Sequence, residues 1–144
     1  MGTRYFALIA GIVYLLVGLL GFIPGLVSAY TGPNLAFDTG AGNLMGLFPI
    51  NILHNIVHLA IGLWGIASYR SFNGSVAFAR GLAIFYGLLT IMGLLPIDAL
   101  RTTFGLIPIH GADVLLHALT ALVAAYFGFM ATGQAEFVDA SRRR

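Results

Sequence analysis

The sequence contains no cysteine and no lysine, and only 8% of its 144 residues are charged. Without cysteine, the chain has no disulfide bonds, no thiolate metal sites and no thiol catalysis. A soluble domain carries about 25% charged residues, because it must cover its surface with solvated side chains. This chain is instead 59% hydrophobic, with a mean hydropathy of +0.94. Its surface must therefore face mainly hydrocarbon, and we expect no nucleic-acid partner.

Long apolar runs occupy most of the chain. A membrane-spanning helix needs about 20 consecutive apolar residues. Four such runs follow one another, at about residues 5–27, 47–69, 76–97 and 109–131. Pro49 and Pro108 stand where the second and fourth helices would begin, a place where proline is tolerated. We expect an all-α fold, a four-transmembrane-helix bundle that forms a single membrane domain over residues 1–144.

The distribution of arginine predicts the orientation of this bundle. Six of the seven arginines lie on one side of the predicted spans: Arg4, Arg70, Arg80, Arg142, Arg143 and Arg144. The positive-inside rule assigns that side to the cytoplasm, so both termini and a short tail at 132–144 are expected there. The alternative is that the first run is a cleaved signal peptide, but it is longer than the usual apolar core of about 7–15 residues.

The two halves of the chain resemble each other. Residues 47–54 (LFPINILH) align with residues 106–113 (LIPIHGAD), and matched residues continue on both sides of this segment. The matched pairs are His58 with His117, Tyr14 with Tyr86, Gly21 with Gly93, and Pro24 with Pro96. This pattern predicts two tandem two-helix repeats, at about 5–69 and 76–131, related by an axis along the membrane normal.

Small residues spaced four apart predict close helix packing. Helices in lipid gain little from burying apolar surface, so close backbone approach and interhelical hydrogen bonds must hold them together. The pairs are Ala7 and Gly11, Gly21 and Gly25, Ala121 and Ala125, and Ala124 and Gly128. We therefore expect a tightly packed bundle.

Polar residues gather on one face of the second and fourth predicted helices. Residues three, four and seven apart lie on one side of a helix. On the second helix these are Asn51, His54, Asn55 and His58, and on the fourth His110, Asp113 and His117. The repeat would bring the two faces together inside the membrane, with His58 and His117 near mid-span.

Metal or haem ligation suits this cluster. A four-coordinate site would use the side chains of His54, His58, Asp113 and His117, a ligand set that suits zinc, copper or iron. Asn51, Asn55 and His110 would orient the imidazoles through hydrogen bonds. Alternatively, His58 and His117 would be the paired axial ligands of a haem, or each would bind a chlorophyll-type pigment.

A purely structural interpretation competes with ligation. Asn51 and His110 would cap the second and fourth helices, with His54 and Asp113 as third-position residues near the positive end of each helix dipole. His58 and His117 would hydrogen-bond across the bundle. The protein would then be an accessory subunit of a larger membrane complex, or a homodimer, surrounded by membrane lipids.

Catalysis is less well supported by the pattern. A metal-dependent membrane hydrolase is a third alternative, but no general acid or base is evident beyond the proposed ligands, and no catalytic residue is assigned. A proton path through the membrane is incomplete, because the cytoplasmic halves of the second and fourth helices (59–64 and 118–125) hold no ionisable residue. The long connection at 28–46 would cover the cluster or dock a partner chain.

The strings NILHNIVHLAIG (residues 51–62) and HGADVLLHALTAL (residues 110–122) carry a family resemblance. With them, nearly the whole chain resembles DUF4383, a family of small bacterial membrane proteins of unknown function. The resemblance implies four helices and a location in the bacterial cytoplasmic (inner) membrane, and it implies no activity. Where this chain has His110 and Val114, the family pattern usually has asparagine, whereas Asp113 and His117 follow the pattern.

Overall fold

A computed structural model describes residues 1–131, which are mostly helical. Five α-helices follow one another: α1 (Gly2–Leu20), α2 (Ile52–Ser68), α3 (Phe72–Leu94), α4 (Asp98–Arg101) and α5 (Ala112–Ala125). A 3-10 turn, η1 (Pro24–Leu26), follows α1, and a π-helical turn, η2 (Tyr126–Met130), continues α5. The predicted tail at 132–144, with its three terminal arginines, lies outside the described residues.

Three helices are long and apolar enough to cross a membrane: α1, α3, and α5 together with η2 (Ala112–Met130). The fourth, α2, is apolar but has only 17 residues. Large apolar side chains point outward from all four helices, as Ile9, Leu63, Ile84 and Leu115 do with 60%, 61%, 68% and 75% of their surface exposed. Such an exterior is consistent with a membrane protein.

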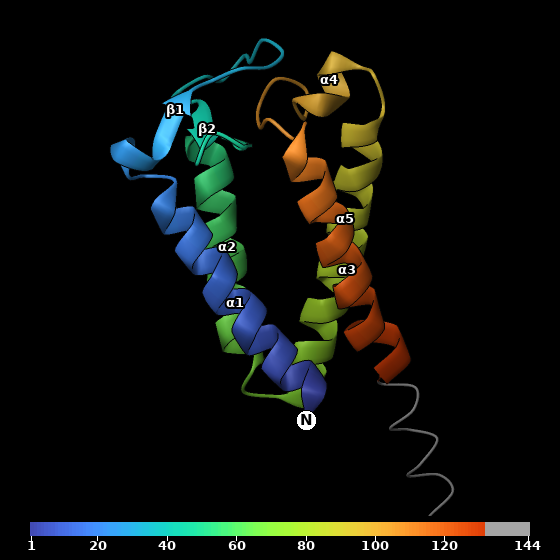
Figure 1. The fold of residues 1–144 in the computed structure, drawn as a ribbon. Coiled ribbons are helices and arrows are strands. Elements are labelled where there is room, and N and C mark those ends of the chain that lie inside the picture. Colours follow the sequence, from blue (N-terminus) through green and yellow to red (C-terminus); the bar gives the residue numbers. More distant parts are fainter. Residues whose placement is uncertain (132–144) are drawn as a thin grey trace, which may run out of the picture.

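The helices pack in two pairs (Figure 1). In the first pair α1 lies along α2, and in the second α3 lies along α5. The two pairs meet near the N-terminus and diverge toward the connecting loops. Phe78, Leu82 and Tyr86 of α3 form the core between the pairs, together with Ala7, Ile61 and Ala124.

Glycine allows the close contact within the first pair. A Cβ atom on Gly11 would lie 2.6 Å from the backbone nitrogen of Ile66, and one on Gly62 would lie 2.6 Å from that of Leu15. Ala7, one turn before Gly11, is fully buried. Tight packing at this pair agrees with the prediction, whereas Gly25 has no atom within 4 Å of the position of a Cβ.

A small sheet before α2 was not expected from the sequence. Strands β1 (Val27–Ala29), β2 (Gly42–Leu44) and β3 (Phe48–Ile50) pair in this order, each antiparallel to the next. The side-chain amide of Asn43 donates to the carbonyl oxygen of Ala29 over 2.8 Å, which links β2 to β1. The sheet uses the chain between the end of α1 and the start of α2, so both helices are shorter than the apolar runs.

Both prolines lie outside the helices they were expected to begin. Pro49 is in β3, and Pro108 is buried in the connection before α5. Proline lacks an N–H and cannot donate in a sheet, but its carbonyl can accept. The carbonyl of Pro49 is therefore available to the site described below.

Candidate metal centre

Three side chains that could bind a metal ion meet where α2 and α5 begin. One ligand atom from each of His54, Asp113 and His117 lies within 4.8 Å of the other two. All three residues are buried, with 3–4% of their surface exposed. These are three of the four predicted metal ligands, and they come from the two helices on which they were predicted.

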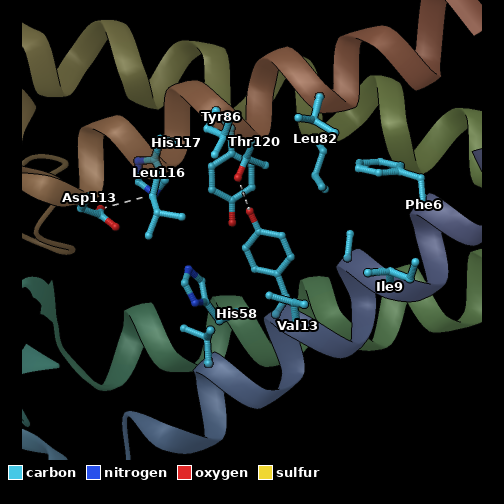
Figure 2. A pocket seen from close by; sticks show the side chains of 15 residues that line it. Phe6, Ile9, Val13, His58, Leu82, Tyr86, Asp113, Leu116, His117 and Thr120 are labelled. Carbon is cyan, nitrogen blue, oxygen red and sulfur yellow. Dashed lines mark hydrogen bonds and ion pairs between the residues drawn. The ribbon is translucent and has the colours of Figure 1, made fainter. Parts of the chain in front are cut away.

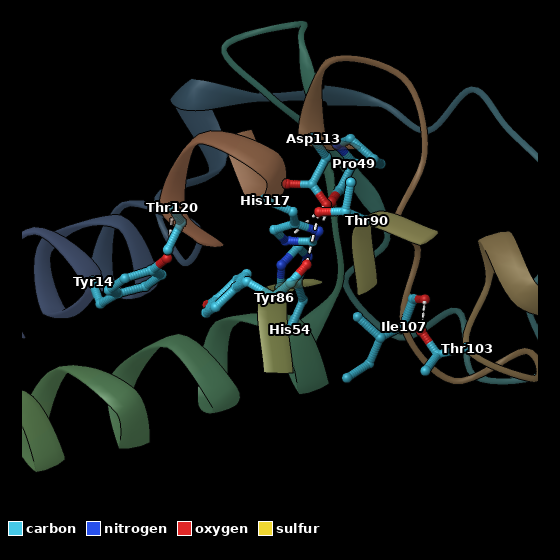
Figure 3. A network of polar contacts seen from close by, with 10 residues as sticks. All are labelled: Tyr14, Pro49, His54, Tyr86, Thr90, Thr103, Ile107, Asp113, His117 and Thr120. Carbon is cyan, nitrogen blue, oxygen red and sulfur yellow. Dashed lines mark hydrogen bonds and ion pairs between the residues drawn. The ribbon is translucent and has the colours of Figure 1, made fainter. Parts of the chain in front are cut away.

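The chain before α2 fixes the position and the tautomer of His54. Asn51 is the N-cap of α2, and its side-chain oxygen accepts from the backbone N–H of His54 over 2.9 Å. The Nδ1 atom of His54 lies 3.1 Å from the carbonyl oxygen of Pro49 (Figure 3). Because a carbonyl only accepts, Nδ1 carries the proton and Nε2 keeps its lone pair. A neutral imidazole with a free Nε2 is the form that binds metal.

Asp113 and His117 are four residues apart at the start of α5, so their side chains lie on one face. Oδ2 of Asp113 is 3.4 Å from Nε2 of His117. Within the described residues, Oδ2 of Asp113 and Nδ1 of His117 are buried without a hydrogen-bond partner. Leaving a buried polar atom unsatisfied costs about 1–3 kcal/mol, and more for a charged group. An additional ligand is therefore expected at these atoms.

The spacing of the three ligand atoms suits an ion after a small contraction. Nitrogen and oxygen ligands about 2.0–2.1 Å from a tetrahedral zinc ion lie about 3.4 Å from one another. The three atoms here are at most 4.8 Å apart, so shifts of about 1 Å would close them around an ion, within the reach of side-chain rotation. Two imidazoles and a carboxylate suit zinc, iron or copper.

The fourth predicted ligand, His58, lies beside this group but outside it. Its ring centroid is 4.5 Å from that of His54, and its ring lies nearly perpendicular to that of Tyr14, with 5.2 Å between centroids. His58 is half-buried and faces a cavity that is also lined by Asp113 and His117 (Figure 2). The two predicted haem ligands, His58 and His117, thus line one cavity.

Two tyrosines connect the site to the rest of that cavity. Tyr86 packs against His117, with 4.9 Å between ring centroids, and Tyr14 packs against Tyr86 at 5.4 Å. The hydroxyl group of Tyr14, on α1, donates to Thr120 Oγ1, on α5, over 3.2 Å (Figure 3). Thr120 was not singled out in the sequence, although its position three residues after His117 places it on the same helical face.

Of the three residues expected to orient the imidazoles, Asn51 holds the backbone of His54, and all three also make contacts elsewhere. The amide of Asn51 donates to the carbonyl oxygens of Phe37 and Leu106, and so ties loops from both halves of the chain to the start of α2. Asn55 is buried against Gly21, where a Cβ atom would clash with its side-chain amide. Nε2 of His110 lies 3.1 Å from the hydroxyl oxygen of Tyr30.

The prediction that Asn51 caps α2 is confirmed, and the prediction that His110 caps the fourth helix is wrong. The N-cap of α5 is Gly111, whose φ of 66° lies in the left-handed region that glycine adopts readily. Asp113 is consequently the second residue of α5, not the third. Burial, and secondarily the charge of Arg101, lower the pKa of the His110 side chain.

The connection at 28–46 lies over the N-terminal end of α2. The carbonyl oxygen of Thr39 accepts from the backbone N–H of Ile52, and the backbone N–H groups of Ala36 and Phe37 donate to the carbonyl oxygen of Gly105. The segment therefore bridges the start of α2 and the loop before α5, at the end of the molecule nearest His54 and Asp113.

Comparison with known proteins gives one match. A family model described as "Domain of unknown function (DUF4383)" matches residues 4–130. No curated protein and no solved structure matches the chain. The matched segment contains every residue of the candidate metal centre.

Proposed function

Because the chain belongs to the DUF4383 family, whose description assigns no activity, we propose its function from the geometry: it is a membrane protein that binds one transition-metal ion through His54, Asp113 and His117. The observation that carries this proposal is the buried side chain of Asp113: its Oδ2 has no hydrogen-bond partner among the described residues, and one of its oxygens lies within 4.8 Å of a ring nitrogen of each of His54 and His117. A divalent cation would compensate the desolvated charge, and ionisable residues within spans are generally functional.

The ion would have three protein ligands and one further position. Zinc, copper and iron all accept this ligand set, and the absence of sulfur argues against a soft-metal or iron–sulfur centre. The fourth position would face the cavity beside His58, whose ring centroid lies 4.5 Å from that of His54 and which would complete the predicted four-ligand set after a rotamer change. We assign the centre a non-catalytic or redox-supporting role, because no general acid or base is evident among the described residues beyond the four predicted ligands.

The fold proposed for this function has four spans. A helix of 17 residues is about 25 Å long and lies at the lower limit of a membrane span. The sheet residues that precede α2 would extend it to the membrane surface. The domain would thus be a single bundle over the chain, with repeats at about 5–69 and 76–131.

Pairs of equivalent contacts support the repeat. Tyr14 packs against His58 in the first half, as Tyr86 packs against His117 in the second. Two further pairs of contacts obey the same correspondence. Gly21 lies against Asn55 as Gly93 lies against Val114, and the hydroxyl of Thr3 donates to the carbonyl of Phe127 as that of Ser75 donates to the carbonyl of Ser68.

We place both termini in the cytoplasm of a bacterium and the protein in its inner membrane. Support comes from Arg4 and Arg80, which lie at the end of the bundle opposite the sheet. Arg4 Nε donates to the carbonyl of Tyr69 and Arg80 Nε to that of Gly128, each over 2.8 Å. Arginines that cap helix ends at one membrane surface agree with the positive-inside rule.

Metal analysis of the detergent-purified protein tests the proposal. After loading with Zn²⁺, Cu²⁺ or Fe²⁺ and gel filtration, elemental analysis should find one ion per chain. Single substitutions His54→Ala, Asp113→Asn and His117→Ala should each lower the occupancy at least tenfold, because each removes one of three ligands. His110→Ala is the matched control: it removes an imidazole that is bonded to Tyr30, and it should leave the occupancy unchanged.

The absorption spectrum separates ligation from its alternatives. A haem or pigment band that disappears in both His58→Ala and His117→Ala would replace the metal proposal with axial ligation. A colourless, metal-free protein that keeps its thermal midpoint would overturn ligation altogether and favour the accessory-subunit alternative. Stoichiometric co-purification of another membrane subunit in mild detergent would then identify the partner.

A further inference from the structure

A cavity of about 340 Å³ lies between α1 and α5 and is also lined by His58 of α2 and by Leu82 and Tyr86 of α3. Its volume is within the range of small-molecule sites, about 300–1,000 Å³. Its walls are almost entirely apolar: Phe6, Ile9, Val13, Leu82, Leu119 and Val123 line most of it. Polar groups lie toward one end, where Thr120 and His58 approach Asp113 and His117 (Figure 2), and Tyr14 reaches this end through its hydrogen bond to Thr120.

The equivalent crevice in the other half of the repeat is filled. There Trp64 of α2 packs edge-on against Phe78 of α3, with 5.0 Å between ring centroids, and lies against Gly81, whose missing Cβ makes room for the indole. By the repeat, Trp64 corresponds to Val123 and Gly81 to Ile9, and both of these line the open cavity. The fold can therefore close such a crevice with its own side chains, and this sequence leaves one of the two open.

The opening faces the membrane. Ile9, Val13 and Leu119 are 60%, 51% and 59% exposed along the two helices that border the cavity. Each of these side chains lies on a helix long enough to span the bilayer. A ligand would therefore enter sideways from the hydrocarbon, and it must itself be soluble in lipid.

The polar end determines the charge of that ligand. Asp113 is the only acid or base among the lining residues apart from the two histidines, and neither lysine nor arginine lines the cavity. In the metal-free protein, an anionic head group would be desolvated beside Asp113 with no lysine or arginine to balance its charge, which is strongly unfavourable. Hydroxyl groups of Tyr14 and Thr120, by contrast, donate and accept hydrogen bonds.

We propose that the cavity between α1 and α5 binds an uncharged single-chain lipid, whose hydroxyl or carbonyl head group is held by Tyr14 and Thr120 and whose tail lies along Phe6, Ile9 and Val123. Asp113 Oδ2 and His117 Nδ1, buried without hydrogen-bond partners among the described residues, lie at the head-group end. The Tyr14–Thr120 hydrogen bond crosses from α1 to α5 and would open to admit the head group. The two proposed sites share Asp113 and His117, so the preference for an uncharged head group applies to the metal-free protein, and lipid binding is measured on protein stripped of metal.

Three probes with one chain length test the head group. Binding of radiolabelled 1-dodecanol, dodecanoate and dodecane is measured at pH 8 to the full chain in nanodiscs, with empty nanodiscs subtracted. Dodecanol should bind saturably, one per chain, and at least tenfold more tightly than dodecanoate or dodecane. Equal binding of dodecanoate would overturn the proposed neutrality, and equal binding of dodecane, or binding that does not saturate, would show an apolar crevice that any acyl chain can enter.

Filling the cavity tests its location. The double substitution I9G/V123W copies the Trp64–Gly81 arrangement of the closed crevice and should lower dodecanol binding at least tenfold. Leu115→Trp is the matched control, because it adds the same indole to α5 at an outward position that is 75% exposed. Equal losses in the two proteins would overturn the assigned site, as would a dimer that dissociates only in I9G/V123W, since a second copy would then be the occupant.

Removing the two hydroxyl groups tests the head-group contacts without changing how the cavity is packed. Tyr14→Phe and Thr120→Val preserve shape but remove one hydroxyl each. Both should reduce the preference for dodecanol over dodecane to within about threefold, which is about 0.7 kcal/mol, while leaving dodecane binding unchanged. Unaltered preference in both variants would overturn the role given to these hydroxyls. Metal content, measured on the same variants without stripping, reports on the metal centre separately.

Discussion

His54 Nδ1 and the carbonyl oxygen of Pro49 are 3.1 Å apart, and this contact places the proton of a buried imidazole. Since the carbonyl can only accept, Nδ1 carries the proton, and Nε2 keeps the lone pair with which His54 could bind a metal ion together with Asp113 and His117. A backbone carbonyl that orients a metal-binding histidine is a common arrangement around metal ions. Here the carbonyl belongs to a proline in a strand, five residues before the histidine.

Replacing His54 by asparagine should separate this structural bond from ligation. The amide of asparagine can still donate toward Pro49, but it offers no ligand where Nε2 was. We expect His54→Asn to lose metal at least tenfold, as His54→Ala does, and to unfold at a higher temperature than His54→Ala. Elemental analysis and thermal unfolding in detergent measure both effects. Retention of metal by His54→Asn would remove His54 from the ligand set.

Gly11 should not tolerate even one added methyl group. A Cβ there would lie 2.6 Å from the Ile66 nitrogen and 2.8 Å from the Gly62 oxygen, both backbone atoms of α2, so the helices would have to separate. We expect Gly11→Ala to destabilise the protein by about 1–3 kcal/mol, the usual cost of overpacking. The thermal midpoint would fall by several degrees.

Gly87→Ala is the matched control for that substitution. Gly87 also lies within a membrane-length helix, α3, but has no atom within 4 Å of the Cβ position. Alanine favours the helix over glycine by about 0.5–1 kcal/mol, so Gly87→Ala should be neutral or slightly stabilising. If both variants unfolded at the same temperature, the close contact between α1 and α2 would be wrong.

Asn51 should contribute more to stability than an ordinary helix cap. Its side chain accepts from the His54 N–H and donates to the carbonyls of Phe37 and Leu106, in a fully buried position. Loss of a cap costs about 1 kcal/mol, and each carbonyl left buried and unsatisfied adds about 1 kcal/mol or more. Asn51→Ala should therefore destabilise the fold by about 3 kcal/mol.

Ser71→Ala provides the comparison. Ser71 is the N-cap of α3 and accepts from the Gly74 N–H in an exposed position. Water replaces the lost partner there, so this variant should cost about 1 kcal/mol or less. Equal unfolding temperatures for Asn51→Ala and Ser71→Ala would mean that Asn51 does not tie the two loops to α2.

The site was predictable from helical spacing, and its surroundings were not. Asn51 and His54 are three residues apart at the start of α2, and Asp113 and His117 are four apart in α5, so position along each helix fixes the face. The repeat then indicated that the two faces meet. The partner of His110, by contrast, is Tyr30, which lies 80 residues away in a loop. No periodicity in the sequence predicts such a contact.

The small sheet escaped prediction for a related reason. Its three strands have three residues each, too few to show an alternating pattern, and the residues around Val27 and Pro49 extend the apolar runs of the neighbouring helices. The predicted spans at 5–27 and 47–69 consequently included Val27 of β1 and all of β3. The tight approach at Gly11 was foreseen from the spacing of small residues, whereas the cavity beside Val123 depends on which crevice a tryptophan fills.

Single cysteines can test both the orientation and the fourth span, since the chain has none of its own. Asp38 lies in the connection before α2 and Asn73 near the start of α3, and both are exposed. In intact bacterial cells, a membrane-impermeant maleimide should label Asp38→Cys fully. It should label Asn73→Cys only after the inner membrane is permeabilised, because the arginines near α3 keep that side in the cytoplasm.

Labelling of both positions in intact cells would mean that α2, only 17 residues long, fails to cross the bilayer. Labelling of Asn73→Cys alone would instead preserve four spans and invert the protein, placing the loop over His54 and Asp113 in the cytoplasm. The two errors therefore give different patterns, and the metal centre remains buried between the helices in either case.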